Sequence, residues 1–422
     1  MANLIIKNGW VVDPLLDTEG IRDIFVSQGK LTDKAPANAK VIDAKGKIVC
    51  PGLIDMHVHL REPGQEEKET ILTGSQAAAK GGFTSICCMP NTQPPIDKAS
   101  DVEYIKNRQQ EIRLVNIFPI ACITKERLGK ELSEMNALAL AGAVAFSDDG
   151  GWVENANVMR RAIEYAQMFN RLIISHCEDS GLSAGGVMNE GALSTKMGLR
   201  PIPNASESIA VSRDILLAEH YGPVHLAHIS TKESVALIRA AKKKGVPVTA
   251  ETAPHYFCLT DEAVEGYNTN AKVNPPLRSD KDVQAIIKGL QDGTIDAIAT
   301  DHAPHTLDDK RTEFDQAAFG ISGLETAFSL GFTTLVTPGK LTLKRFISAM
   351  TCEPAKVLQL KNKGSLQPGN DADIVIIDPE KSWTVRASEF VSKGKNTPFD
   401  GWELTGVVTH TILGGRSVYE CE

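Results

Sequence analysis

From Gly52 onward, short apolar runs alternate with helical stretches of about a dozen residues, and no other feature constrains the fold as strongly. We expect eight of these runs to be strands: Leu53–His59, Thr84–Met89, Val115–Ala121, Ala143–Ser147, Leu172–His176, Val224–His228, Val246–Glu251 and Ala297–Thr300. The helical stretches between them include Lys68–Lys80, Val158–Asn170 and Lys232–Lys244. Alternating strands and helices are typical of a parallel sheet, and eight such units over roughly 250–300 residues predict a TIM-type (β/α)8 barrel.

Both ends of the chain have a different pattern, in which short apolar runs are separated by turns. The N-terminal runs predict a small sheet of hairpins and are Leu4–Ile6, Trp10–Val12, Ile24–Val26 and Val41–Ile42. The same rhythm returns after Cys352 in the runs Asp373–Ile377, Trp383–Val385, Val407–Ile412 and Ser417–Glu420. We therefore expect residues 1–50 and 356–422 to form one small β-sandwich domain beside a barrel of residues 51–355.

Composition limits the classes of partner. The 422 residues carry a formal net charge of −8, with 42% hydrophobic and 23% charged residues, as in an ordinary soluble globular protein. Because no Lys/Arg block stands out, we expect neither nucleic acid nor an anionic membrane as a partner. Neither a signal peptide nor a membrane-spanning apolar stretch is predicted. Eight scattered cysteines without a CxxC motif indicate reduced thiols in a cytoplasmic protein.

Five segments place a candidate metal ligand or acid–base group directly after a predicted strand. They are Asp55–His59, Ser147–Gly150, Ile174–Glu178, Leu226–Ser230 and Ala299–Ala303. The carboxyl ends of barrel strands converge on one mouth, so these groups should meet there. Imidazole and carboxylate ligands together suit a hydrolytic metal such as zinc. The sequence therefore predicts a metal site at the mouth of the barrel.

Four histidines are central to this prediction. His57 and His59 are two residues apart on a strand, so both imidazoles point to the same face. Taken alone, such a pair is more often held by structural hydrogen bonds than by a metal. With His176 and His228 at the ends of two further strands, however, the set is hard to explain by packing. We therefore expect all four to be metal ligands.

The carboxylates beside these histidines leave alternatives open. Asp148 and Asp149 follow a strand, and either could bridge two metal ions, while the structural alternative is a turn with Gly150. Strand alternation does not decide between the two aspartates. Asp301 follows the eighth strand and could be a metal ligand, a general acid–base or both, with a helix N-cap as the structural alternative.

Basic side chains near the same mouth indicate a site for an anionic substrate. Arg61 is suited to hold a carboxylate, because a guanidinium can bind both carboxylate oxygens. Its structural alternative is a surface ion pair with Glu62 or Glu66. His302 and His305 follow in a loop after the eighth strand, and we expect them to face the substrate.

Several of these segments together resemble one family. The segments are Pro51–Gly64, Met89–Thr92, Phe146–Gly150, His176–Asp179, His228–Thr231, Asn274–Arg278 and Thr300–His305. In these segments, and over essentially its full length, the chain resembles the type I dihydroorotases of the cyclic amidohydrolase group. The His-x-His pair alone marks only the wider superfamily, whereas the segments jointly are very specific.

The resemblance implies a role for each matching residue. His57 and His59 would bind one zinc ion, His176 and His228 a second, and Asp149 would bridge the two ions. Asp301 would be the catalytic acid–base and would also be a candidate ligand of the first zinc. The substrate contacts would be His59, Arg61, Asn91, Asn274 and His305, with the backbone of Phe319 and Gly320. The family reaction is the reversible cyclisation of N-carbamoyl-L-aspartate to (S)-dihydroorotate in pyrimidine synthesis.

One departure from the wider group concerns the bridging ligand. Hydantoinases and type II dihydroorotases bridge their metals with a carboxylated lysine, but no lysine stands at the end of the fourth predicted strand. This favours an aspartate bridge, with one or two zinc ions per chain. The expected assemblies are a homodimer or a complex with aspartate transcarbamoylase.

Two other functions compete with dihydroorotase activity. The first is another cyclic amidohydrolase activity, such as allantoinase or dihydropyrimidinase, and Arg61 and Asn91 argue against it. The second is an inactive subunit that supports aspartate transcarbamoylase, and the complete set of candidate ligands argues against that.

Overall fold

The structure is a computed structural model that describes residues 3–421. Its centre is a sheet of parallel strands in the order β6-β7-β8-β9-β10-β13-β14-β15. The strands are β6 (Leu53–Val58), β7 (Phe83–Cys88), β8 (Asn116–Ala121), β9 (Ala145–Phe146), β10 (Leu172–Ser175), β13 (Val224–Leu226), β14 (Val248–Thr252) and β15 (Ala297–Ile298). Each lies within or beside one of the eight predicted strands. The (β/α)8 barrel is therefore confirmed.

The barrel is nearly closed by contacts between β6 and the segment that follows β15. Val58 forms an isolated parallel bridge with His302, and the backbone N–H of His59 donates to the carbonyl oxygen of His302 at 2.8 Å. Asp55 accepts a hydrogen bond of 3.0 Å from the backbone N–H of Thr300. These contacts bring the first and last strands of the barrel side by side.

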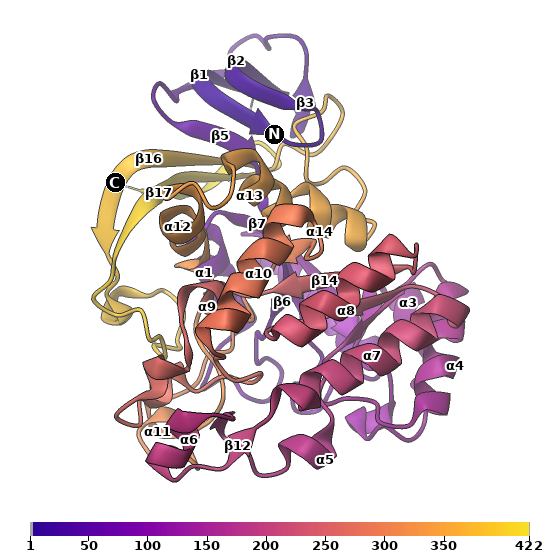
Figure 1. The fold of residues 1–422 in the computed structure, drawn as a ribbon. Helices are drawn as coiled ribbons and strands as arrows, with labels where there is room; N and C mark the ends of the chain where they lie inside the picture. The colour runs from indigo at the N-terminus through magenta and orange to yellow at the C-terminus, as the bar shows by residue number, and fades with distance from the viewer. Residues whose placement is uncertain (1–2, 422) are drawn as a thin grey trace.

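The helices cover the outside of the barrel, and the longer ones among them bury one face. In α4 (Ala156–Gln167), the side chains of Met159, Ala162, Ile163 and Ala166 are buried, which is the i, i+3, i+4, i+7 spacing of an amphipathic helix. Asn155 caps its N-terminus by accepting from two backbone N–H groups. Figure 1 shows α7, α8 and α10 lying side by side on this outer layer.

The remaining helices and strands of this part of the chain have the following bounds. The helices are α1 (Ile71–Lys80), α2 (Ala99–Ile112), α3 (Met135–Ala141), α5 (Ser180–Ser183), α6 (Ala192–Met197), α7 (Asn204–Tyr221), α8 (Lys232–Lys243), α9 (Pro254–Cys258), α10 (Asp280–Asp292), α11 (Leu307–Lys310), α12 (Ala327–Gly331), α13 (Leu343–Met350) and α14 (Cys352–Val357). The short strands β11 (Met188–Asn189) and β12 (Pro201–Ile202) pair in a loop. Within residues 3–421, no helix is both long and apolar enough for a membrane crossing.

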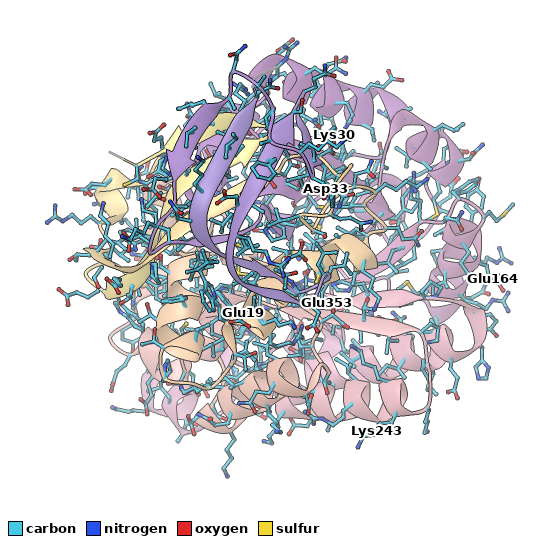
Figure 2. The ribbon with its side chains drawn as sticks, turned by 90° about the horizontal axis from the view of Figure 1, so that it is seen from above. Glu19, Lys30, Asp33, Glu164, Lys243 and Glu353 are labelled. Carbon is cyan, nitrogen blue, oxygen red and sulfur yellow. The ribbon has the colours of Figure 1, made fainter. Side chains whose placement is uncertain are left out.

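A mixed sheet joins the two ends of the chain. Its strands are β1 (Leu4–Asp13), β2 (Thr18–Ser27), β3 (Lys30–Thr32), β4 (Lys40–Asp43), β5 (Ile48–Pro51), β16 (Ile374–Thr384), β17 (Glu403–Leu413) and β18 (Arg416–Glu420). β5 pairs antiparallel with β16, so Cys50 lies opposite Val375. Figures 1 and 2 show the indigo N-terminal strands beside the yellow C-terminal strands. The expected small β-domain of both chain ends is present and has its own apolar core.

Two details of this domain differ from expectation. The runs Leu4–Ile6 and Trp10–Val12 belong to the single strand β1, because the register shift near Asn8 (φ 62°) absorbs the residues that resembled a turn. The expected sheet of hairpins is found for β1, β2 and β3, which pair antiparallel in sequence order, whereas β4 and β5 both pair with β1 in parallel. The domain boundaries at about residues 50 and 355 stay a prediction.

Candidate active site

A cavity of about 220 Å³ opens where the barrel strands end. The residues predicted from the sequence that line it are His59, Arg61, Asn91, Asp149, His176, His228, Asn274, Asp301, His305, Phe319 and Gly320. His57 is completely buried, with its Nε2 3.4 Å from Asp149 Oδ1. The fold thus brings the whole predicted set to one place, although its members are spread over more than half of the chain.

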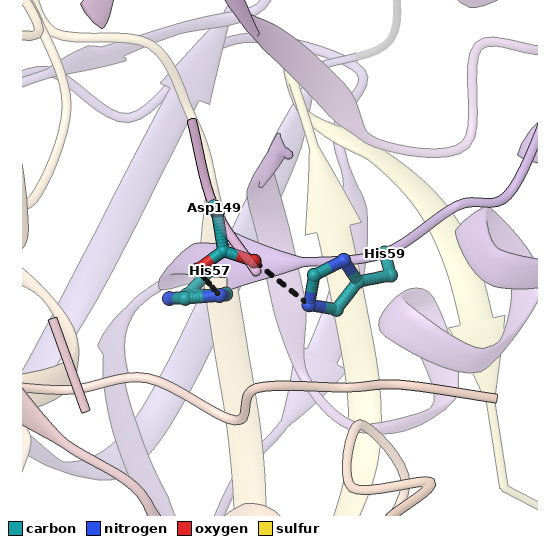
Figure 3. A group of neighbouring side chains, drawn as sticks. All are labelled: His57, His59 and Asp149. Atoms are coloured by element: carbon teal, nitrogen blue, oxygen red, sulfur yellow. Dashed lines mark ion pairs between the residues drawn. The ribbon is translucent and has the colours of Figure 1, made fainter. Parts of the chain in front are cut away.

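The first group of possible ligands comes from β6 and the loop after β9. His57 and His59 present their imidazoles on the same side, as residues two apart on a strand do. Figure 3 shows the Asp149 carboxylate between them, with Oδ1 3.4 Å from His57 Nε2 and Oδ2 3.7 Å from His59 Nε2. The alternation in the sequence therefore predicted the geometry of this pair.

A second group shares the same carboxylate. His176 Nδ1 lies 3.5 Å and His228 Nε2 lies 3.6 Å from Asp149 Oδ1. In each three-residue group the potential ligand atoms all lie within 4.8 Å of one another. His57 Nε2 and Asp149 Oδ1 are buried, and neither makes a hydrogen bond to the described part of the chain. Buried polar atoms without partners are costly, so this arrangement fits one or two bound cations.

Each of three histidines is oriented by a partner on its other ring nitrogen. His57 Nδ1 lies 2.8 Å from Glu251 Oε1, and His59 Nδ1 lies 2.8 Å from Asn91 Oδ1. His176 Nε2 lies 2.8 Å from Glu178 Oε2. Because these oxygens accept, the N–H of each ring is assigned to that side, and the opposite nitrogen offers its lone pair toward Asp149.

Sequence reasoning missed Glu251 and Glu178 as parts of the site. Glu251 ends a predicted strand and Glu178 follows His176 by two residues. Their positions at or just after strand ends were the signal that could have identified them. Burial by itself would raise the pKa of Glu251, but His225, 3.4 Å away, and the hydrogen bond with His57 lower it to about 2. Glu251 is therefore an ionised carboxylate in contact with His57.

The two adjacent aspartates point to different surroundings. Asp148 Oδ1 accepts from the backbone N–H groups of Ile123 at 2.8 Å and Thr124 at 3.0 Å, and its Oδ2 accepts from the Thr124 hydroxyl. Asp149 instead faces the histidines. Asp148 thus anchors a neighbouring loop.

Asp301 lies beside the first histidine pair. Its Oδ1 is 3.1 Å from His59 Nε2 and 3.5 Å from His57 Nε2. Burial alone would raise the pKa of Asp301, but the hydrogen bond with His59 and the neighbouring imidazoles hold it well below its usual range. The carboxylate is therefore ionised and able to accept a proton.

Backbone strain is concentrated in this cavity. Arg61, His228 and Asp301 have φ values of 62°, 35° and 48°, in the left-handed region that bulky residues rarely adopt. Such conformations persist where the surrounding structure imposes them, and they cluster at functional sites.

A buried cation also lines the cavity. Arg61 donates through Nε to the carbonyl oxygen of Pro304 at 3.2 Å, and within residues 3–421 no carboxylate lies within ion-pair distance of it. Burial lowers the pKa of Arg61 to about 10, so the guanidinium stays charged at neutral pH. Glu62, one of its proposed surface partners, instead pairs with Arg108. The surface ion-pair alternative is therefore wrong.

The loops after β15 contribute further residues to the lining of the cavity. His305 Nε2 lies 2.8 Å from the carbonyl oxygen of Phe319, and burial together with the charge of Arg61 lowers the pKa of His305 to about 3. At Gly320, which has a φ of 145°, a Cβ would lie 2.6 Å from a backbone oxygen, so only glycine fits. His302 does not line the cavity, because its Nδ1 accepts from the backbone N–H of Gly323 and its Nε2 faces Glu69. The expectation that His302 faces the substrate was wrong.

Comparison with known proteins agrees with this geometry. Residues 46–234 match a family model described as dihydro-orotase-like, and residues 280–419 match the amidohydrolase family. A dihydroorotase from Pelotomaculum thermopropionicum is 56% identical over 99% of this chain and 98% of its own length. One from Syntrophus aciditrophicus is 53% identical over 99% of both chains. The chain belongs to the dihydroorotase family. It is an enzyme of the cyclic amidohydrolase class.

A solved structure extends the likeness to related enzymes. The L-hydantoinase (dihydropyrimidinase) from Arthrobacter aurescens superposes with a TM-score of 0.87 at 28% identity, covering 100% of this chain and 96% of that one. The barrel and the small β-domain are therefore shared beyond the dihydroorotase family, and the fold alone does not select the substrate.

Substitution can distinguish the roles of Asp148 and Asp149. Asp149→Ala should lower metal affinity by at least roughly 10–100-fold, the usual loss when only a supporting partner of a ligand is removed. Asp148→Ala should keep the metal and lower the free energy of unfolding by about 1–3 kcal/mol, because two buried N–H groups lose their acceptor. Elemental analysis and thermal melting measure both effects. Loss of metal in Asp148→Ala alone would contradict the assignment.

Proposed function

We propose that this dihydroorotase-family enzyme catalyses the reversible cyclisation of N-carbamoyl-L-aspartate to (S)-dihydroorotate, in the pyrimidine pathway that leads to UMP. One observation supports this substrate over uncharged cyclic amides. The buried guanidinium of Arg61, which has no carboxylate partner in the described chain, lines the same cavity as the histidines and Asp149. A substrate with a ring carboxylate supplies the missing anion, whereas dihydrouracil, hydantoin and allantoin carry none.

The metal is proposed to be zinc. His57 and His59 would hold one ion, His176 and His228 a second, and Asp149 would bridge them, with Asp301 as a further candidate ligand of the first. Bound zinc would supply Lewis-acid activation of water and of the substrate carbonyl. Imidazole and carboxylate ligands suit this ion, and the two groups share one carboxylate, which supports up to two ions per chain.

Asp301 is proposed as the acid–base. In the hydrolytic direction its ionised carboxylate accepts the proton of the attacking water and delivers it to the ring nitrogen that leaves. In the direction of ring closure it takes the proton from the ureido nitrogen. The position of Asp301 in the cavity, with Oδ1 3.1 Å from His59 Nε2, supports this role, and its low pKa means only that the carboxylate is in the ionised form that can accept a proton.

The chain's own donors are proposed to orient the substrate. Arg61 would hold the ring carboxylate through two charge-assisted hydrogen bonds, with Asn91 and His305 beside it. Asn274 and the backbone of Phe319 and Gly320 would contact the rest of the ring. His59 lines the cavity as well and would contact both metal and substrate.

Assembly and compartment are proposed on the resemblance. We expect a cytoplasmic enzyme that forms a homodimer or a complex with aspartate transcarbamoylase. The net charge of −8 without a basic block supports the expectation that nucleic acid is not a partner. Sedimentation of the purified chain, alone and with aspartate transcarbamoylase, tests the assembly.

A substrate panel tests the proposed function. The wild type should hydrolyse dihydroorotate far better than dihydrouracil, hydantoin or allantoin, because the uncharged analogues leave Arg61 unpaired. Arg61→Met should reduce kcat/KM for dihydroorotate by a factor that corresponds to about 2–5 kcal/mol, as for a broken buried charge pair. Its metal content should be unchanged.

Arg161→Met is the matched control, because Arg161 is exposed on α4. It should leave kcat/KM at the wild-type value. Comparable wild-type rates on dihydrouracil and dihydroorotate would refute the proposal and favour a general cyclic amidase. A wild type that binds zinc but hydrolyses none of the four compounds would favour the inactive supporting subunit.

A further inference from the structure

One carboxylate oxygen connects the metal-binding side of the cavity to a residue on its substrate side. Glu178 Oε2 accepts from His176 Nε2 at 2.8 Å and from Asn274 Nδ2 at 2.8 Å. His176 follows β10, whereas Asn274 lies 96 residues from Glu178 in the loop before α10. The two donors therefore share a single acceptor atom, although they come from separate loops.

Each of the two bonds fixes a different property of the site. The bond to His176 places the ring N–H on Nε2, so that Nδ1 faces Asp149 at 3.5 Å and His228 at 2.8 Å. The bond to Asn274 fixes the orientation of its side-chain amide, because an ionised carboxylate can only accept hydrogen bonds. The NH₂ group of Asn274 is turned to Glu178, and its oxygen is left to accept from another donor.

We infer that Glu178 is a positioning residue that couples metal binding at His176 to the placement of the Asn274 amide. A cation on Nδ1 makes the opposite N–H of the ring a stronger donor, which tightens its bond to Glu178. The same carboxylate oxygen accepts from Asn274. When its bond to His176 fixes the position of the Glu178 carboxylate, the position of the Asn274 amide is fixed as well. In this way the metal-loaded enzyme presents a hydrogen-bond acceptor at a defined place in the cavity.

The surroundings favour a strong coupling. The His176 side chain is 3% exposed and that of Glu178 is 19% exposed, so both bonds are largely shielded from water. Hydrogen bonds to an ionised acceptor in such surroundings are stronger than in water. The substrate part of this inference rests on the proposed function, whereas the metal part does not.

Zinc affinity gives the first test. Competition with a chromophoric chelator should show zinc binding weakened by roughly 10–100-fold in Glu178→Ala, the usual effect of losing the partner of a ligating histidine. Glu178→Gln should bind zinc more tightly than Glu178→Ala, because the glutamine oxygen can still accept both bonds without the charge. Glu190→Ala removes an exposed glutamate of the same region and should bind zinc as the wild type does.

The KM for dihydroorotate gives the second test. Glu178→Ala and Asn274→Ala should each raise KM, whereas Glu178→Gln should stay near the wild-type value. The double variant Glu178→Ala/Asn274→Ala should have no higher a KM than Asn274→Ala, because Glu178 acts on the substrate through Asn274. If Glu178 were merely structural, the increases in KM of the two single variants would multiply in the double variant. Glu178→Gln would then not keep KM near the wild-type value. Melting of the chelator-treated variants shows whether each one is folded.

Two results would overturn the inference. One is a folded Glu178→Ala variant with wild-type zinc affinity, and the other is a double variant in which the two increases in KM multiply. The zinc titration requires no substrate, so it tests Glu178 even if the wild type fails to hydrolyse dihydroorotate. That failure would count against the proposed function alone.

Discussion

Protein stripped of metal by a chelator should lose dihydroorotate hydrolysis altogether, and added zinc should restore it. His57, His59, His176 and His228 surround Asp149 with nitrogens 3.4–3.7 Å from its oxygens, an arrangement that is compatible with bound cations. Without an ion the site lacks its Lewis acid, and two buried atoms, His57 Nε2 and Asp149 Oδ1, have no hydrogen-bond partner in the described chain. Elemental analysis and the hydrolysis assay should be made on the same preparation.

A pair of histidine variants sharpens this test. His57→Ala should behave like the metal-free protein, because it removes a fully buried candidate ligand. His220→Ala removes an exposed histidine at the end of α7 and should match the wild type in both metal content and rate. Full activity in protein that elemental analysis finds free of metal would rule out a metal-dependent reaction. Zinc content per active chain also decides between one ion and two.

Asp301→Asn should lower turnover by roughly 10²–10⁴-fold, the usual contribution of a positioned acid–base group. Asparagine keeps the size of the side chain and can still accept a hydrogen bond, but it cannot take up the proton. We expect some metal to remain, because the four histidines and Asp149 are untouched. Turnover under saturating substrate, with metal content measured in parallel, separates loss of the acid–base from loss of a ligand.

Asp308→Asn is the matched control for this substitution, because Asp308 is exposed on the short helix α11, which follows Asp301 in the chain. It should keep the wild-type turnover. If Asp301→Asn retained near-normal turnover with its metal in place, another group would have to move the proton. If it lost all metal, its main role would be that of a ligand.

The barrel was predictable from the sequence because its signals are local. A strand of the parallel sheet is buried on both faces, so it appears as an unbroken apolar run, as in β7, whose six residues are all buried. A covering helix buries one face, as in α4, and shows the period of a helix. A local pattern also predicted that the His57 and His59 imidazoles lie together, because alternation along one strand sets the direction of both side chains.

Local patterns predicted less well where the backbone leaves regular structure. β9 and β15 contain two residues each and are shorter than the runs that predicted them. Beyond β9, alternation no longer applies, and so the choice between Asp148 and Asp149 required the folded chain. The N-terminal runs likewise became one strand, because a pairing irregularity can replace a turn.

The sequence by itself determined the fold class, the family resemblance and the set of residues expected at the barrel mouth. Only the tertiary structure decided which groups face one another. Glu251 lies 194 residues from His57, and Asn274 lies 96 residues from the Glu178 carboxylate that holds it. No local period connects such positions, because their distance depends on how separate strands and loops converge. The same holds for the buried Arg61, whose lack of an anionic partner in the described chain is a property of its neighbours in space.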